Sequence, residues 1–362
     1  MGFPKVKVSV SDGNLLRSIN APDAVPALLT REYTGGILTV YSPEDAIAKG
    51  IGSLDAEDHE QFPYTAALVS MFYKELAGNS RLFIAPLTAA NLENLAARGV
   101  NIAAWVDTAY NDSQLLTASA TIKSTCQKVQ AAGFPLRVLA GGSITAAVLS
   151  ETDVKSFDNP YLGIVAGEDS ETGASLAAAA LARCCKYGAE VKIGSGKNGA
   201  LVSVTDVNIG GAAYSSYTLA QLETMHDNGF IMPQHRTGAA GYFFGVDNMC
   251  TNGDYRILAH GRIIDKAQTI IQQAYAPFVE DTIRVSDDGS IDEGDVSYLE
   301  NVLECSILAN MTAQISGVQV VIDKNQDIIN TSTLNVSCRI LPLGYATWIN
   351  VTLGLTTAIT NS

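Results

Sequence analysis

The segment RLFIAPLTAANLENLAARGVNIAAWVDT (81–108) combines a strand pattern and a helix pattern in close succession. Its first six residues form an apolar run typical of a buried strand, and 100–108 repeat that pattern. Between them, LTAANLENLAARG (87–99) has the apolar spacing of an amphipathic helix and ends at a glycine. Strands that alternate with helices in this way are typical of α/β folds, whose sheets contain parallel strands. The segment therefore predicts an α/β fold.

The same alternation continues on both sides of this segment, from about residue 37 to residue 193. ILTVYS (37–42) predicts a strand, and a helix is expected to follow it. Ser42 can cap that helix, Pro43 suits its first turn, and the acidic Glu44 and Asp45 interact favourably with the helix dipole. Further helices are predicted at 65–79, 115–133 and 172–188, and further strands at 134–142 and 161–167.

After residue 200 the chain is richer in loops, and it ends in an alternating sequence. Helices are predicted at 219–229 and within 256–281. The tail from residue 317 onward alternates apolar and polar residues, which is typical of strands with one buried face. The apolar positions of the tail are Val318, Val320, Ile322, Leu334, Val336, Cys338, Ile340, Ile349, Val351, Leu353 and Leu355, and the amino terminus has the same period at Val6, Val8 and Val10.

Both chain ends are therefore predicted to be half-buried strands. The C-terminal strand is separated from the preceding residues by Pro342 and Gly344 and ends in a polar stub. A strand in this position has unpaired N–H and C=O groups that can pair with another chain, so it can link subunits. The alternative is that both ends pair within their own sheet.

The chain has 37 acidic and 23 basic residues among 362, which gives a formal net charge of -14. Binding to nucleic acid or to anionic lipid requires basic patches, so this balance argues against both as partners. We find no apolar run of membrane-spanning length and no secretory signal, which predicts a protein made and kept in the cytosol. The charge is uneven: residues 280–304 hold nine acids and one base, Arg284, so we expect a basic partner surface near them.

Residues Gly194–Gly199 match the pattern G-x-G-x-x-G. In a dinucleotide-binding fold this pattern joins a strand to a helix whose N-terminus holds the pyrophosphate. Here a strand-like run, ALVSV (200–204), follows instead, so the segment is predicted to be a glycine-rich hairpin or a surface loop. An α/β enzyme that binds a nucleotide or phosphate at Gly194–Gly199 is the alternative function.

No other motif predicts a catalytic centre, a metal site or a cofactor. The acidic run SDDGSIDEGDVSYLE (286–300) departs from a calcium-binding loop at Glu293, where glycine belongs, and at Leu299, where a bidentate glutamate belongs. A turn at Asp288-Gly289 followed by a helix accounts for the run. The four histidines also lack the spacing of metal ligands. We therefore expect a protein that is not an enzyme.

Two stretches resemble the contractile tail sheath proteins of bacteriophages and related injection machines. YSPEDAIAKGIG (41–52) and TAALVSMFYKELAGNSRLFIAP (65–86) resemble an early strand, capped helix, long apolar helix and strand of that family. Residues 222–267 resemble a later helix, a strand, a glycine turn before an aromatic residue, and a second helix. The matching positions are Gly229, Phe230, Ile231, Gly238, Gly241, Phe243, Arg262, Ile263, Ile264, Asp265, Lys266 and Ala267, and the resemblance covers roughly residues 30–100 and 220–362.

The resemblance implies a structural subunit that polymerises as hexameric rings or a helix around an inner tube and contracts to drive the tube through a target envelope. The implied partners are copies of the chain itself, the tube protein, and baseplate and terminator proteins. Assembly is expected in the bacterial cytoplasm, and the product is a virion tail or a released or cell-borne contractile particle. The implied domains are an N-terminal arm (1–20), an α/β sheath domain (21–219) with an inserted subdomain around 100–200, a C-terminal α+β assembly domain (220–345), and a C-terminal arm (346–362).

In this resemblance the arms are the strands from Val6 to Val10 and from Trp348 to Leu355. A helix from about Asp295 to Thr312 is expected to face the tube, with Asp295, Tyr298, Glu300 and Glu304 as candidate contacts. Relatives with a basic helix at this place have an acidic tube. If the acidic helix here faces the tube, either the tube presents lysine or arginine to it or its acids point elsewhere. A different self-assembling shell protein, such as a capsid or surface-layer subunit, is a further alternative.

Overall fold

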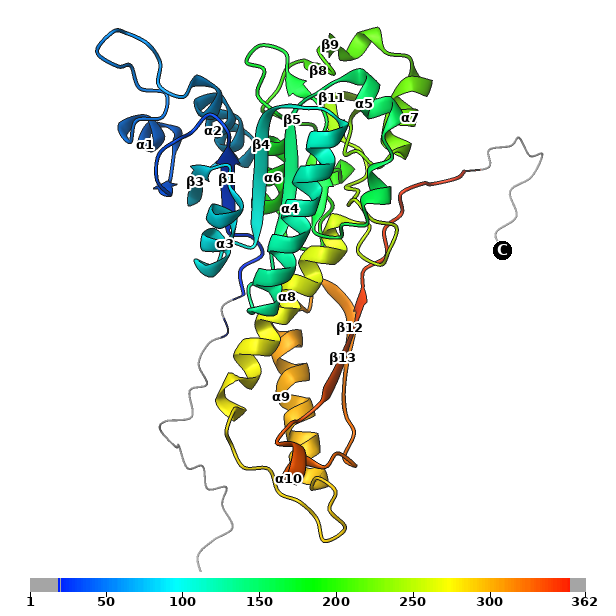
Figure 1. Ribbon diagram of the computed structural model, residues 1–362. Helices are drawn as coiled ribbons and strands as arrows, with labels where there is room; N and C mark the ends of the chain where they lie inside the picture. The colour runs from blue at the N-terminus through cyan, green and yellow to red at the C-terminus, as the bar shows by residue number, and fades with distance from the viewer. Residues whose placement is uncertain (1–18, 20, 352–362) are drawn as a thin grey trace, which may run out of the picture.

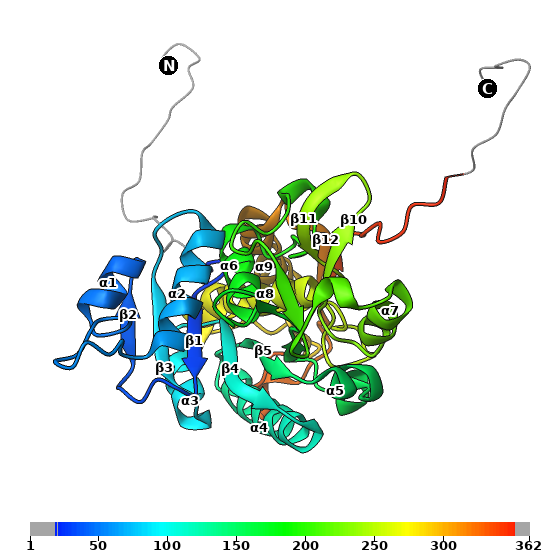
Figure 2. The same cartoon turned by 90° about the horizontal axis from the view of Figure 1, so that it is seen from above.

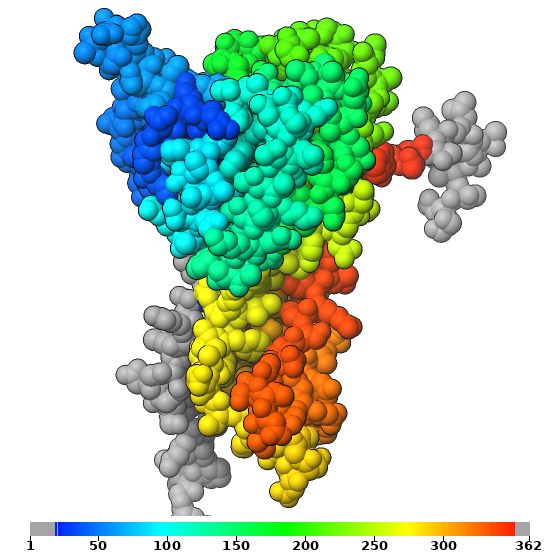
Figure 3. Space-filling model, viewed as in Figure 1, coloured from blue at the N-terminus to red at the C-terminus, as the bar shows by residue number. Residues whose placement is uncertain are grey.

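The computed structural model describes residue 19 and residues 21–351 of the chain. Figure 1 shows a wide α/β body above and a narrower part below, which is formed by two long helices and a strand hairpin. Each part has its own hydrophobic core, the first built from residues between Val25 and Leu258 and the second from residues between Ile263 and Val320. The space-filling view in Figure 3 shows the same division as a change in the width of the molecule.

The body is organised around a six-stranded sheet with the order β2-β3-β1-β4-β5-β6. Neighbouring strands are parallel, except that β2 runs antiparallel to β3 at one edge. The predicted α/β class with parallel strands is confirmed. The strands are β1 (Pro26–Thr30), β2 (Leu38–Val40), β3 (Leu82–Pro86), β4 (Ile102–Tyr110), β5 (Arg137–Ile144) and β6 (Leu162–Ile164).

The sequence patterns did not predict β1, although it lies in the middle of the sheet, between β3 and β4. Its five residues, PALLT, are all buried. A short strand that is buried on both faces has no alternation of polar and apolar residues to reveal it. It also begins with a proline, which a sheet tolerates at the first residue of a strand.

Helices cover both faces of the sheet. Helices α2 (Pro63–Leu76) and α6 (Ala177–Lys186) pack together on one face, while α3 (Ala89–Ala97) and α4 (Asp112–Ala131) cover the other, as Figure 2 shows. As the alanine-rich sequence predicts, α6 is enclosed on most sides. Helix α1 (Pro43–Ala48) also begins as predicted, because the Ser42 hydroxyl accepts a hydrogen bond of 3.1 Å from the backbone N–H of Asp45.

Shorter elements complete the body. They are α5 (Ala146–Glu151), α7 (Leu219–Asp227), the hairpin of β10 (Pro233–Arg236) and β11 (Ala239–Phe244), the small sheet of β7 (Glu168–Asp169), β8 (Val207–Ile209) and β9 (Ala212–Ala213), and the 3-10 turns η1 (Val154–Phe157), η2 (Gly196–Asn198) and η3 (Tyr214–Ser216). A further 3-10 turn, η4 (Ala276–Phe278), belongs to the lower part. The strand-like prediction for 200–204 is wrong. The Glu75 carboxylate accepts the backbone N–H groups of Val202 and Ser203, so no neighbouring strand pairs with them.

The lower part consists of α8 (Leu258–Tyr275), α9 (Glu293–Met311), the single turn α10 (Ile328–Thr331), and the antiparallel strands β12 (Ile315–Ile322) and β13 (Val336–Pro342). Alternation in these two strands is confirmed. Their residues Val318, Val320, Val336, Cys338 and Ile340 all face the second core. Leu334 precedes β13, Ile349 and Val351 lie in irregular backbone, and Val6, Val8, Val10, Leu353 and Leu355 lie outside the described residues.

Helix α8 contributes to both cores. Leu258, at its first residue, belongs to the core of the body, whereas Ile263, Ala267 and Ile270 belong to the core of the lower part. One continuous helix therefore runs through the junction of the two parts (Figure 1). Over residues 21–351, no helix is both long enough and apolar enough to cross a membrane.

Candidate functional site

The motif residues of α8 lie at the junction between the body and the lower part. Arg262 is buried, and its guanidinium donates hydrogen bonds to the carbonyl oxygens of Cys184 (2.6 Å), Tyr187 (3.2 Å) and Gly188 (3.2 Å). These carbonyls lie at the C-terminal end of α6, where a helix has unpaired acceptors and a partial negative charge. Arg262 therefore caps α6 from the neighbouring helix.

One helical turn away, Asp265 forms a buried ion pair with Arg137, the first residue of β5. The Nε and Nη2 atoms of Arg137 each lie 2.7 Å from an oxygen of the Asp265 carboxylate, and both side chains are buried. Gly261 makes room for this pair, because a Cβ atom there would lie 2.9 Å from the guanidinium of Arg137. The glycine inside α8 thus has a packing reason that outweighs its low helix propensity.

Lys266 connects three separate segments. Its Nζ lies 2.9 Å from Oδ1 of Asp23, which precedes β1, and 2.9 Å from Oε1 of Gln314, which precedes β12. Gln314 also donates to Asp23 at 2.8 Å. Burial raises the pKa of Asp23, but the hydrogen bonds from Gln314 and Lys266 outweigh it and hold that pKa below its ordinary value. The start of the body and the lower part are thus joined through one carboxylate.

The other motif positions lie around the β10–β11 hairpin. Gly229, Gly238 and Gly241 all have positive φ angles, +97°, +79° and +85°, which residues with a side chain rarely adopt. Phe243 is buried, and the guanidinium of Arg236 lies 4.8 Å from the centre of its ring. The three glycines therefore allow tight turns, and Phe243 packs in the interior. The motif positions that connect the two parts are those of α8.

The segment Gly194–Gly199 is held by arginine side chains through its carbonyl oxygens. Arg183 donates to the carbonyl of Gly199 at 3.0 Å, and Arg236 donates to that of Gly194. Arg183 also forms a buried ion pair of 2.8 Å with Glu75. The only helical turn in the segment is the three-residue η2. The predicted surface loop is thus confirmed, but it lacks the strand-to-helix geometry with which a glycine motif holds pyrophosphate.

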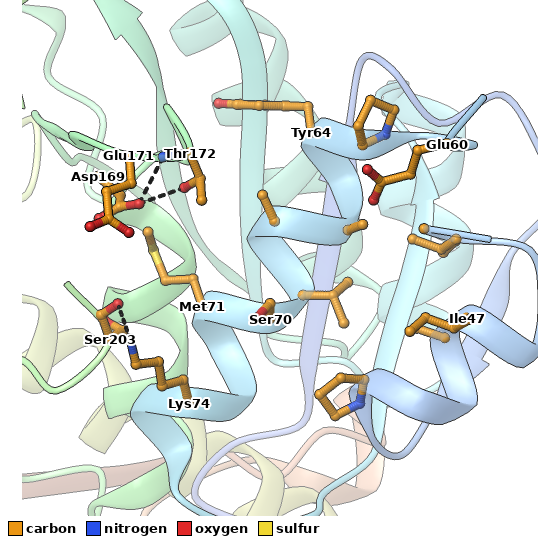
Figure 4. A pocket seen from close by; sticks show the side chains of 18 of the residues that line it. Ile47, Glu60, Tyr64, Ser70, Met71, Lys74, Asp169, Glu171, Thr172 and Ser203 are labelled. Carbon is orange, nitrogen blue, oxygen red and sulfur yellow. Dashed lines mark hydrogen bonds between the residues drawn. The ribbon is translucent and has the colours of Figure 1, made fainter. Parts of the chain in front are cut away.

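A groove of about 690 Å³ lies along α2 (Figure 4). Two of its charged side chains have partners within the chain, whereas the buried Ser203 hydroxyl has none among the residues that the structure describes. Lys74 donates to the carbonyl of Ser203 at 3.2 Å, and the Asp169 carboxylate accepts two hydrogen bonds from Thr172. The rest of its wall is largely apolar, with Ile47 and Met71 among the residues that line it. In the described part of the chain, no three acidic, histidine or cysteine side chains are grouped so as to hold a metal ion.

The four candidate tube contacts have different environments on α9. Asp295 pairs with Arg284 at 2.6 Å, and Glu300 accepts the backbone N–H of Ile322 at 2.7 Å. Both carboxylates therefore bind within the chain, while Glu304 is half-buried and Tyr298 is exposed. The exposed residues of α9 beyond its first turn are Ser297, Tyr298, Asn301, Cys305, Leu308 and Ala309, all uncharged.

After β13 the chain returns to the body before it leaves the surface. The Tyr345 hydroxyl donates to the carbonyl of Glu190 at 2.5 Å, its ring stacks against His260 with 5.6 Å between the centres, and the Lys192 Nζ lies 5.5 Å from the ring centre. Burial and the charges of Asp247 and Glu190 raise the pKa of Tyr345 to about 12, so the phenol stays neutral and can donate. Tyr345 therefore anchors the segment after β13 to the body.

The residues beyond this anchor project from the molecule. Trp348, Ile349 and Val351 are each 79% exposed, and Figure 1 shows this segment running away from the body. Three large apolar side chains in a row of four residues are unusual on the surface of an isolated subunit. The described part of the C-terminal arm is therefore available to a partner.

Several residues of this site were not predicted. Asp23, Gln314 and Tyr345 bind partners that lie 243, 48 and 155 residues away in sequence. A single sequence has no signal for such distant pairs. The sequence does carry a signal for Arg137, because it is a charged residue within the apolar strand predicted at 134–142. A charge buried in a strand requires a partner.

Comparisons with known proteins support the fold of the whole chain. Residues 254–360 match the family model described as the C-terminal domain of DUF2586. No curated protein is similar enough to match. The solved helical sheath of the anti-feeding prophage, in its contracted state, is 16% identical with a TM-score of 0.67, and the match covers 98% of this chain and 99% of that chain.

Two further solved structures give the same result. The contracted sheath complex of PVC, an extracellular contractile injection system, is 12% identical with a TM-score of 0.66 and coverage of 99% and 98%. The sheath tail protein from Desulfitobacterium hafniense is 11% identical with a TM-score of 0.54 and coverage of 94% and 100%. The chain therefore has the fold of these sheath proteins over nearly its full length, and the resemblance predicted from the sequence is confirmed at the level of fold.

Proposed function

We propose that this chain is a structural subunit of a contractile sheath, which polymerises with copies of itself around an inner tube and contracts to drive the tube through a target envelope. The observation that best supports this function is the extent of the shared fold, which includes the α/β body and the lower part together. Such a role requires neither a catalytic residue nor a cofactor, because the free energy of contraction is stored when the sheath assembles.

A contracting sheath needs two kinds of contact between subunits. Contacts between domain faces must exchange when subunits rotate and slide, whereas another set must hold throughout. Strand pairing suits the second set, because backbone hydrogen bonds depend little on side chains and survive reorientation of the bodies that they connect. In this division of labour the arms, 1–20 and 346–362, link neighbouring subunits.

The hairpin of β12 and β13 is the surface on which such arms would pair. Within residues 21–351 these two strands pair with no third strand, so each has an outer edge without a strand partner. An added strand from a neighbour would extend the two-stranded sheet. Two-stranded sheets are marginally stable alone, so the same pairing would also stabilise the lower part.

The contacts of α8 support movement of the subunit as one body. Arg262, Asp265 and Lys266 each bond to residues of the α/β body, and Lys266 also bonds to Gln314 in the lower part. Bending the junction would leave buried charges without partners, which costs several kcal/mol. We therefore place the exchangeable contacts between subunits and not inside this one.

Helix α9 is the candidate for the surface that faces the tube. The carboxylates of Asp295 and Glu300 are engaged inside the chain, so the exposed uncharged face around Tyr298 carries this contact. The expected basic partner surface belongs instead beside the lower tip of the molecule. The exposed acids there include Glu280, Asp281, Asp287 and Asp288.

Electron microscopy of the purified protein tests the proposed function. A sheath subunit forms hollow cylinders or stacked rings, alone or on its tube partner. Closed shells or flat lattices would instead support a capsid or surface-layer protein. A protein that stays monomeric under all conditions, including with its tube partner present, would contradict the proposal. The same images show which domain faces the axis of the cylinder. We expect it to be the C-terminal domain (220–345), which contains α9.

A further inference from the structure

A second groove, of about 530 Å³, lies where α8, the loop 252–256 and the end of β13 meet. Its size is within the range of pockets that bind compact side chains or small ligands. The apolar side chains that line it include Ile264, Ile340 and Pro342, and its rim includes Asn252, Asp254 and Arg256. The loop residues of the rim are exposed. The groove therefore combines apolar walls with polar groups at its opening.

The tail of the same chain passes this groove without filling it. Tyr345 stacks on His260, which also lines the groove, and the backbone then continues away from the body. Trp348 follows three residues later and is 79% exposed. The subunit thus carries a large apolar side chain and a groove with both apolar and polar lining, and the two do not meet within one molecule.

We propose that this groove receives the Trp348 side chain of a second copy of the chain. The inference rests on the proposed self-assembly and specifies one contact within it. Trp348 and the groove are different surfaces of the subunit, so the contact is head-to-tail. Each copy donates one tryptophan and accepts another, and contacts of this type generate rings or open helical polymers.

The chemistry of the groove suits an indole. An aromatic side chain buries about 150–250 Å² on such a contact, and the walls at Ile264 and Ile340 offer apolar area. The indole N–H needs an acceptor when it is buried, and the side-chain oxygens of Asn252 and Asp254 lie at the rim. The guanidinium of Arg256 forms no ion pair with any residue that the structure describes, so it is free to stack on the ring.

The position of the groove suits the arm as well. It lies at the end of β13, whose outer edge has no strand partner among the described residues. An arm that pairs along this edge would pass the groove. Strand pairing alone specifies the register weakly, and a tryptophan that fits one pocket would fix which residues pair. The inferred role of Trp348 is therefore to set the register and to anchor the arm.

Tryptophan fluorescence tests the inference directly, because the chain has two tryptophans and the other, Trp105, is buried in β4. In the dilute subunit, iodide should quench the emission of Trp348 and leave that of Trp105. On assembly, the emission of Trp348 should shift to shorter wavelength and lose its accessibility to iodide. The variant Trp105→Phe isolates this signal. A Trp348 that stays quenchable in assembled protein, or that is already protected in the monomer, would overturn the inference.

Two variants test the contact from both sides. Trp348→Ala should raise the concentration needed for assembly about 30-fold, the effect of losing about 2 kcal/mol at an interface anchor. Gly253→Leu should do the same by filling the groove. It should fold normally, because a Cβ atom there would lie 3.5 Å from the nearest side chain, an ordinary contact. Leu219→Ala, which removes a side chain that is 70% exposed on α7, is the control and should assemble normally.

Mixing the two variants distinguishes a second copy from the molecule's own tail. The groove of Trp348→Ala accepts the tryptophan of Gly253→Leu, but the reverse contact is missing. Below the concentration at which either variant assembles alone, the mixture should therefore form heterodimers and no polymer. Folding back of the tail onto its own groove predicts no heterodimer. Normal assembly of both variants would overturn the inference and leave the sheath function intact, whereas a wild-type chain that never assembles would remove the proposed function itself.

Discussion

Arg137, at the start of β5, and Asp265, in the middle of α8, form a buried bidentate ion pair with both N···O distances at 2.7 Å. This pair joins the central sheet of the body to the helix that continues into the lower part. Arg137 also donates to the carbonyl of Pro160 at 2.7 Å and lies over the rings of Tyr161 and Tyr255. Each of its three guanidinium nitrogens therefore donates a hydrogen bond.

The first prediction concerns this pair. Asp265→Ala leaves the buried guanidinium of Arg137 without its counter-charge and should lower the free energy of unfolding by about 3–5 kcal/mol. Urea denaturation followed by circular dichroism measures the change. Arg31→Ala is the matched control, because the Arg31–Asp107 pair has a half-exposed arginine and should contribute at most about 1 kcal/mol. Equal effects of the two variants would contradict the assigned role.

The second prediction concerns pH and Asp23. The folded-state pKa of this carboxyl lies below its ordinary value of 3.8, so its contribution to stability is full above that value and is lost as pH falls through the folded pKa. Asp23→Asn should therefore be less stable than the wild type at pH 7, and the difference should shrink as the pH drops below about 4. Thermal unfolding of both proteins at several pH values checks this. A difference that does not change with pH would argue against an ionised Asp23.

The third prediction separates two glutamates on α9. Glu300→Ala removes the acceptor of the Ile322 backbone N–H and should lower the free energy of unfolding by about 1–3 kcal/mol. Glu304→Ala, one turn further along the helix, should change it by less than about 0.5 kcal/mol. Denaturant titration gives both values. If Glu304→Ala proved the more damaging, the internal role assigned to Glu300 would be wrong.

The fourth prediction concerns the arm. Removal of residues 346–362 leaves the Tyr345 anchor in place, so the truncated chain should keep the circular dichroism and unfolding transition of the wild type. It should nevertheless fail to polymerise, because the segment proposed to link subunits is absent. Analytical ultracentrifugation and negative-stain microscopy measure the two properties. Ordered tubes formed by the truncated chain would rule out the arm assignment.

The fifth prediction addresses the alternative function at Gly194–Gly199. This loop should not bind phosphate groups, because its nearest arginines already donate to the carbonyls of Gly194 and Gly199 and its only helical turn is the three-residue η2. NAD, ATP and inorganic phosphate should each leave the thermal unfolding temperature unchanged. Stabilisation by any of them that is lost in Lys197→Ala would revive the enzyme hypothesis.

Sequence patterns were sufficient to predict the fold class, the helix start at Ser42, the core-facing residues of β12 and β13, and the resemblance to sheath proteins. These features depend on local patterns, because capping and the alternation of side chains involve residues only a few positions apart. The same patterns did not predict β1, whose short buried run has no periodicity.

The role of the charged motif of α8 depends on contacts that form only when the whole chain folds. The partners of Arg262, Asp265 and Lys266 come from α6, β5 and the segment before β1, and no spacing in one sequence connects them. The same holds for Glu300, which its sequence places on an acidic helix but which binds Ile322 inside the chain. A buried charge is stable only where distant backbone and side chains converge on it, so its role follows from the packing of the whole chain.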